Sequence, residues 1–201
     1  MKVLMINGSP HKSGCTYTAL SIVAEALAAE GIESEIVWLG NGPVQDCIGC
    51  FGCRKTGTCV FDADNLSALK AKCAEADGFI FGSPVYYAHP SGRILSVLDR
   101  LFFSGSAEFK GKPGAAVVSA RRAGTTASID VLNKYFSIAQ MPIVGSSYWN
   151  MVHGGKAEEV LQDSEGVQTM KNLGRNMAAL LKGEALPNPA NEYGSWTCFI
   201  R

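Results

Sequence analysis

The fold is decided by the stretch Val3-Leu4-Met5-Ile6-Asn7-Gly8-Ser9-Pro10-His11-Lys12-Ser13-Gly14-Cys15-Thr16 near the start of the chain. Its first four residues form a short apolar run, which is typical of a buried strand in a parallel sheet. The Asn-Gly-Ser-Pro segment ends that strand, and apolar residues then recur at helical spacing until Gly31. The stretch therefore predicts a strand, a loop and a helix in succession.

The rest of the chain repeats this alternation. Further strands are predicted at residues 35–39, 79–82 and 115–119, and a short fifth strand at 142–145. Further helices are predicted at residues 65–76, 94–102, 126–140 and 170–181. Strands that alternate with helices at this interval form right-handed βαβ units and share one parallel sheet. We therefore expect an α/β fold, a doubly wound five-stranded parallel sheet with helices on both faces.

Length and composition narrow the class of protein. A chain of 201 residues without a linker fits a single domain over residues 1–201, with residues 188–201 as a C-terminal tail over the domain or a partner subunit. The formal net charge is zero, and no apolar run approaches the about 20 residues of a membrane span. We expect neither a nucleic-acid nor a membrane partner. Because no export signal is recognisable, the seven cysteines are expected to stay reduced in the cytoplasm.

The loop at residues 8–16 is a candidate phosphate site. It follows a strand at the carboxyl edge of the expected sheet and opens a helix, whose N–H groups and dipole favour an anion. A Walker loop is excluded because Ser13 stands where that motif needs its second glycine. A dinucleotide fingerprint is excluded because Pro10 stands where that motif also needs a glycine. The alternative is a polar turn that binds nothing.

Three loops resemble those of the flavodoxin-like NAD(P)H-dependent FMN reductase family. The first resembles the family pattern Gly-Ser-Pro-Arg/His-x-x-Gly-Asn-Thr, with Cys15 in place of the usual Asn, so that a weak thiol donor replaces one side-chain contact to the phosphate. Residues 82–92 resemble the second flavin loop, Ser-Pro-x-Tyr, and residues 119–125 stand where the third is found. Residues 148–154 and 199–201 also look like this family. The resemblance implies a flavodoxin-like fold that binds FMN at the carboxyl edge of its sheet.

The resemblance also implies which residues bind FMN. They are Ser9, His11, Ser13, Gly14, Cys15, Thr16, Pro84, Val85, Tyr86, Tyr87, Ala120, Arg121 and Gly124. The backbone after Pro84 would face the edge of the isoalloxazine, and a tyrosine would cover the ring. Rim aromatics and solvated arginines are the alternatives for these side chains. We expect His153 to be structural, and we assign no catalytic side chain because the chemistry is centred on the flavin.

Cys47, Cys50, Cys53 and Cys59 are separated by two, two and five residues. Four thiolates are what a [4Fe–4S] cluster requires, and this spacing resembles the iron–sulfur flavoprotein branch of the same family. Three alternatives stay open: a zinc site, thiol redox chemistry, and plain packing in a flavin reductase without a cluster. Cys73 falls in a helix pattern and is expected in the core, whereas Cys198 lies in the tail.

The resemblance implies an FMN-dependent oxidoreductase that takes hydride from NAD(P)H and reduces a quinone, flavin, nitro or azo-type acceptor. One alternative is an iron–sulfur flavoprotein that carries single electrons through a [4Fe–4S] cluster on the cysteine segment. Another is a non-catalytic flavin- or metal-binding module. The expected partners are NAD(P)H, a small-molecule or protein electron acceptor, and further copies of the chain in a homodimer or homotetramer.

Overall fold

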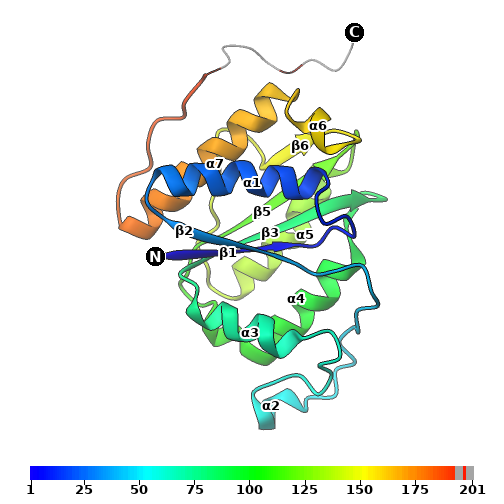
Figure 1. Ribbon diagram of the computed structural model, residues 1–201. Helices are drawn as coiled ribbons and strands as arrows, with labels where there is room; N and C mark the ends of the chain where they lie inside the picture. The colour runs from blue at the N-terminus through cyan, green and yellow to red at the C-terminus, as the bar shows by residue number, and fades with distance from the viewer. Residues whose placement is uncertain (193–196, 198–201) are drawn as a thin grey trace.

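A parallel sheet runs through the middle of the computed structural model, which describes residues 1–192 and 197 (Figure 1). Its strands are β1 (Lys2–Asn7), β2 (Glu33–Trp38), β3 (Gly78–Tyr86), β5 (Gly114–Ala120) and β6 (Met151–His153), in the order β2-β1-β3-β5-β6. The two-residue β4 (His89–Pro90) pairs antiparallel with the end of β3. The order reverses after β1, as in doubly wound sheets. The predicted fold class is confirmed.

Helices cover both faces of this sheet. One face carries α1 (Cys15–Ala29), the short α6 (Ala157–Val160) and α7 (Ser164–Lys182). The other carries α3 (Leu66–Glu75), α4 (Gly92–Gly105), the 3-10 turn η1 (Ser106–Glu108) and α5 (Thr125–Ile138). A short helix, α2 (Cys53–Thr56), lies away from the sheet beyond α3 and α4 (Figure 1).

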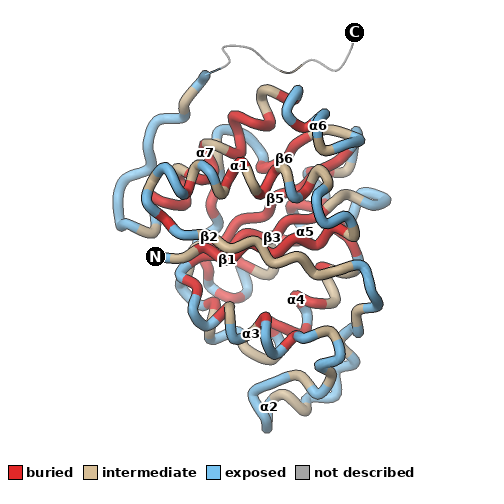
Figure 2. Tube along the Cα trace, in the orientation of Figure 1, coloured by how far each residue is buried: buried red, intermediate tan, exposed pale blue. Residues whose placement is uncertain are grey.

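The apolar runs of the sequence are apolar because the strands are buried on both sides. Along β1, Val3 and Met5 pack against the layer of α1 and α7, whereas Leu4 and Ile6 pack against the layer of α3 and α4. All four side chains are fully buried. Figure 2 shows the burial concentrated along β1, β3 and β5, whereas the edge strand β2 is mostly intermediate and α2 with its flanking loops is exposed or intermediate.

The position predicted for the fifth strand was wrong. Residues 142–145 make only one isolated bridge, between Ile143 and Gly114 at the start of β5. The strand proper is β6, which pairs with Val118 to Ala120 at the end of β5. The chain therefore runs along the edge of β5 twice, with an excursion between the two contacts. Residues 148–154, which we expected to follow the fifth strand, contain it instead.

Two local predictions also need correction. The segment of residues 83–87 was expected to be a loop, but β3 continues to Tyr86 and turns back into β4 through Tyr87 and Ala88, both at positive φ. The cysteine segment, for which we predicted no helix, contains one, because Cys53 opens the single turn of α2. This turn ends at Gly57, whose φ of 71° is the left-handed conformation usual after a helix.

The described part of the C-terminal tail lies along α7. The backbone N–H of Ala190 donates to Asn172 Oδ1 at 3.1 Å, and that of Glu192 donates to Gln168 Oε1. Cys198 and residues 199–201 lie outside the described residues. Within residues 1–192, no helix combines the length and apolar character that a membrane crossing requires.

Candidate functional site

The three predicted flavin loops meet at the carboxyl edge of the sheet. Gly8 after β1 donates its N–H to the carbonyl of Gly82 in β3 at 2.8 Å, and Ser91 Oγ donates to the carbonyl of Gly8 at 2.8 Å. The hydroxyls of Thr16 and Ser119 pair at 2.8 Å, which joins α1 to β5. Loops from the first, third and fourth parallel strands in chain order therefore form one surface, as the sequence predicted.

The first loop leaves the start of α1 open to an anion. Gly14 is the N-cap residue, no side chain caps the helix, and its first turn contains no acidic residue. The first N–H groups of a helix have no partner within it, so these are available to a phosphate. His11 and Ser13 are exposed beside them, and Gly14 is half-buried.

Other predicted FMN residues hold the loop itself. Ser9 is buried, and its Oγ accepts from the backbone N–H of His11 at 3.1 Å. Trp38 Nε1 donates to the carbonyl of Ser9 at 2.8 Å from the end of β2. Cys15 Sγ donates to the carbonyl of Gly154 at 3.4 Å, and burial raises the pKa of its thiol. The thiol that replaces the usual Asn thus ties α1 to the segment after β6.

The second loop presents a hairpin tip at the rim of this surface. Pro84 and Val85 are half-buried, Tyr86 is 46% exposed and Tyr87 is 103% exposed, so neither ring is covered by the described part of this chain. In the third loop Ala120 is buried and Arg121 is exposed.

Gly124 is where the second and third loops touch. Its φ is +93°, and a Cβ there would lie 2.6 Å from Ala88 Cα and 2.9 Å from Val85 Cγ1. A side chain would therefore push the two loops apart, in addition to a cost of about 1–2 kcal/mol for the left-handed backbone.

We predict that Gly124→Ala lowers the affinity for FMN by at least about tenfold, because the clash displaces two of the three loops expected to bind FMN. A tenfold loss corresponds to about 1.4 kcal/mol of binding free energy. The matched control is Gly111→Ala, since Gly111 has a φ of +77° but open space around its Cβ. Fluorescence titration of the apoprotein with FMN measures both. Equal FMN affinity in the two variants would show that the contact does not shape the flavin site.

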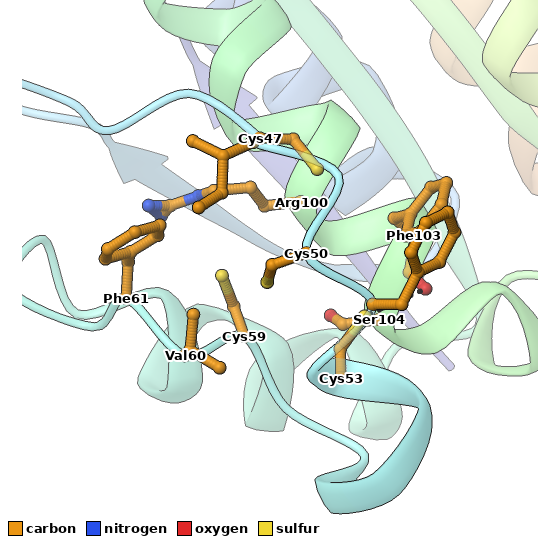
Figure 3. A pocket seen from close by; sticks show the side chains of 11 residues that line it. Cys47, Cys50, Cys53, Cys59, Val60, Phe61, Arg100, Phe103 and Ser104 are labelled. Atoms are coloured by element: carbon orange, nitrogen blue, oxygen red, sulfur yellow. Dashed lines mark hydrogen bonds between the residues drawn. The ribbon is translucent and has the colours of Figure 1, made fainter.

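The second candidate site is a pocket formed by the cysteine segment and α4 (Figure 3). Its lining consists of Cys47, Ile48, Cys50, Phe51, Cys53, Cys59, Val60, Phe61, Arg100, Phe103 and Ser104. Gly52 permits the close packing of this loop, because a Cβ there would lie 2.6 Å from Val60 Cγ1. Cys53 Sγ donates to the carbonyl of Phe103 at 3.7 Å, so the segment is fastened to the end of α4. All four predicted thiols line this one apolar pocket.

A buried charge closes the pocket on the side of α4. The side chain of Arg100 has no exposed surface, and its Nη2 donates to both carboxylate oxygens of Asp64 at 2.7 Å. Arg100 Nε and Nη1 are buried without a hydrogen-bond partner among the described residues. A buried donor left unpaired costs about 1–3 kcal/mol, and more when it is charged. A residue with unsatisfied cationic donors therefore lines the same pocket as the four thiols.

The four thiols are a donor set that a tetrahedral zinc ion and an iron–sulfur cluster both accept. Among residues 1–192 and 197, no three Cys, His, Asp or Glu side chains converge closely enough to hold one ion. A tetrahedral zinc needs all its sulfurs about 2.3 Å from one point. The four thiols line one pocket together with Arg100, whose Nε and Nη1 are buried without a hydrogen-bond partner among the described residues. Four thiolates are also the ligands that a [4Fe–4S] cluster requires, so the donor set fits that group.

The remaining residues singled out in the sequence have structural positions. Cys73 is fully buried in the core, and burial raises the pKa of its thiol to about 12. His153 Nδ1 lies 3.5 Å from Asp163 Oδ2 and its Nε2 lies 3.1 Å from the carbonyl of Arg122. These contacts link β6, α7 and the third loop, which agrees with the structural role expected for His153.

Sequence reasoning missed Trp38, Ser119, Asp64 and Arg100. For Arg100 the pattern favoured a solvated side chain, because position 100 lies away from the apolar stripe of Leu98 and Leu101 on the predicted helix. The other three carried no signal that their neighbours in sequence could have revealed, since each pairs with a residue far away in the chain.

Comparison of the sequence with known proteins identifies the family. The sequence model described as NADPH-dependent FMN reductase matches residues 1–156. The chain belongs to the NADPH-dependent FMN reductase family. It is 33% identical over 190 residues to an iron–sulfur flavoprotein of Methanocaldococcus jannaschii. That alignment covers 90% of this chain and 98% of the relative. The chain is 29% identical over 187 residues to an iron–sulfur flavoprotein of Methanosarcina thermophila, covering 90% and 96%.

The solved structures agree on the fold. A flavodoxin from the domain Archaea aligns with a TM-score of 0.61 at 15% identity, over 90% of this chain and 99% of that one. This NADPH-dependent FMN reductase family member is therefore a flavodoxin-like flavoprotein oxidoreductase. It lies in the branch of the iron–sulfur flavoproteins that the cysteine spacing predicted.

Proposed function

We propose that this protein is an FMN oxidoreductase that draws electrons from NAD(P)H and carries a [4Fe–4S] cluster on Cys47, Cys50, Cys53 and Cys59. The observation that carries the proposal is the single pocket lined by the four thiols and backed by the unpaired donors of Arg100. Relatives that span 90% of the chain and bear the name iron–sulfur flavoprotein support it.

Three loops would hold FMN in this proposal. The open start of α1, with Ser13 and Gly14, would receive the phosphate through backbone N–H groups. Val85 and Tyr86 from the second loop and Gly124 from the third would border the isoalloxazine. FMN supplies hydride acceptance and electron release when bound, so the chain needs to position it and to admit an acceptor. The exposed Arg121 and the hairpin tip would lie at the entrance.

The cysteine segment would add a one-electron centre. A [4Fe–4S] cluster supplies single-electron transfer when bound. The four thiols must lose their protons to bind iron, so Cys53 would give up its hydrogen bond to the carbonyl of Phe103. Because Cys50 is exposed and the other three are half-buried, a protein partner can approach this centre closely.

We predict that protein purified without oxygen holds about four irons and one FMN per chain, with a broad shoulder near about 400 nm added to the flavin bands. Iron and flavin are measured chemically, and NADPH oxidation is followed with a quinone as acceptor. Flavin and turnover without iron would contradict the cluster but keep the oxidoreductase. Iron without NADPH or NADH oxidation would favour an electron carrier.

A second candidate function rests on one observation. Because Cys53 Sγ already donates a hydrogen bond to the carbonyl of Phe103, the cysteine segment also fits plain packing in an FMN reductase that works without a cluster, on quinone, flavin, nitro or azo-type acceptors. The same iron measurement separates the two, since only the first requires about four irons per chain.

A further inference from the structure

We propose that the Arg100–Asp64 pair sets the reduction potential of the centre held in the cysteine pocket, with Arg100 as the residue that favours its reduced form. The inference rests on the proposed function, because it needs a cluster in that pocket. It assigns a role to two residues that lie outside the four cysteines and outside the flavin loops.

The burial of Arg100 indicates that the pair is part of a built site. Arg100 is the largest fully buried side chain of the described residues, and it stands on α4, whose other buried residues are apolar. A buried arginine is rare unless it is paired or serves a ligand. Asp64 satisfies only Nη2, which takes both carboxylate oxygens at 2.7 Å.

The unpaired donors are on the residue that lines the cysteine pocket. Arg100 Nε and Nη1 are buried without a partner, and Arg100 is among the side chains around the four thiols in Figure 3. Guanidinium N–H groups cannot be relieved by deprotonation, because arginine stays charged in proteins. An anionic group with sulfur acceptors in the pocket would accept hydrogen bonds from them. Water would satisfy them less well, because the lining of the pocket is apolar.

The sign of the effect follows from charge alone. When a centre in the pocket takes up one electron, no bond breaks and the pocket gains one negative charge. A fixed positive charge nearby stabilises that product more than the reactant, and hydrogen bonds to the sulfurs act in the same direction. Arg100 therefore raises the potential. Asp64 opposes it, because its carboxylate offsets part of the positive charge.

Asp64 also connects this charge with solvent. Its side chain is 15% exposed and borders a neighbouring cavity of about 320 Å³ that is lined by β2, the segment after it and α3. The pair thus lies between the cysteine pocket, which Arg100 lines, and this second cavity, which Asp64 lines. Because Asp64 does not line the cysteine pocket, its replacement changes the charge near the pocket without changing the lining of the pocket. Asp64 is therefore the more specific of the two sites for a test.

The test is a redox titration of the anaerobically purified protein, followed by electron paramagnetic resonance. We expect Arg100→Met to lower the midpoint potential by at least 59 mV, a tenfold change in the equilibrium of a one-electron couple. Asp64→Asn is expected to raise the potential. Arg100→Lys keeps the charge but loses the planar donors, and should fall between Arg100→Met and the wild type.

Opposite shifts separate this role from a structural one, because damage to the pocket would move both variants in the same direction. Glu192→Gln is the control, since it removes an ion pair with Lys171 and Arg175 on the opposite face of the sheet. If Arg100→Met does not fold, Arg100→Lys and Asp64→Asn still give the two signs. Unchanged potentials in iron-containing variants, or shifts of equal sign, would overturn the inference alone. Wild-type protein without iron would overturn the cluster, and the inference with it.

Discussion

Replacement of Cys50 with serine is expected to remove most of the iron from the protein and to leave its FMN in place. Cys50 lines the pocket between the other thiols and is the exposed one of the four. A serine hydroxyl is a hard, neutral ligand and does not replace the thiolate that iron–sulfur clusters require. We expect the iron content to fall from about four per chain to below about one. Cys59→Ser should give the same result.

The retention of FMN makes this result specific. The flavin loops lie at the carboxyl edge of the sheet, whereas the cysteine pocket lies between the segment of α2 and α4. Cys73→Ala is the matched control, because Cys73 is a cysteine of the core whose thiol stays protonated, with a pKa raised to about 12 by burial. Iron bound equally by wild type, Cys50→Ser and Cys73→Ala would show that the cysteine segment does not ligate it.

Strand positions could be predicted where burial alone decides them. The runs at residues 3–6, 79–82 and 115–119 are buried on both faces, so their composition reveals them. The fifth strand could not be placed, because two short segments lie against β5. Val144 donates its backbone N–H to Gly114 at one end, and Gly154 donates to Ala120 at the other. A segment with Pro142 and Gly145 has the right hydrophobicity for a strand, but it makes only one bridge before the chain leaves the sheet edge.

The site residues divide in the same way, into those that lie close together in sequence and those that only tertiary packing brings together. The glycines and hydroxyls of the loop at residues 8–16 follow one another in sequence, and the topology of a parallel sheet brings them to one edge. The pairing of Asp64 with Arg100, 36 residues apart, depends on how α4 packs beside the start of α3. Trp38, which supports Ser9 from β2, depends on the register of β1 and β2. Such contacts are set by tertiary packing, which periodicity does not record.

A negative charge placed at the start of α1 is expected to change flavin affinity and protein stability in different ways. Ser13 is exposed, one residue before the N-cap, beside N–H groups without an acidic neighbour. An acidic side chain near a helix N-terminus stabilises the helix by about 0.3–1 kcal/mol. The same charge repels the FMN phosphate, and like charges in contact cost several kcal/mol. Since every 1.4 kcal/mol is about tenfold in affinity, we expect Ser13→Glu to weaken FMN binding about 100-fold while its thermal midpoint in the apoprotein stays equal or rises.

Two controls isolate the electrostatic cause of that loss. Ser13→Gln adds a side chain of similar size without charge and should bind FMN nearly as the wild type does. Ala28→Glu adds the same charge to the exposed far end of α1, about 20 Å from its start, beyond the screening length of about 10 Å at 0.1 M salt. It should leave FMN affinity unchanged. Because the repulsion is electrostatic, the deficit of Ser13→Glu should shrink as salt rises in titrations of the apoprotein. A deficit shared equally by Ser13→Gln would mean that the loop excludes bulk rather than charge, and would remove the phosphate from this position.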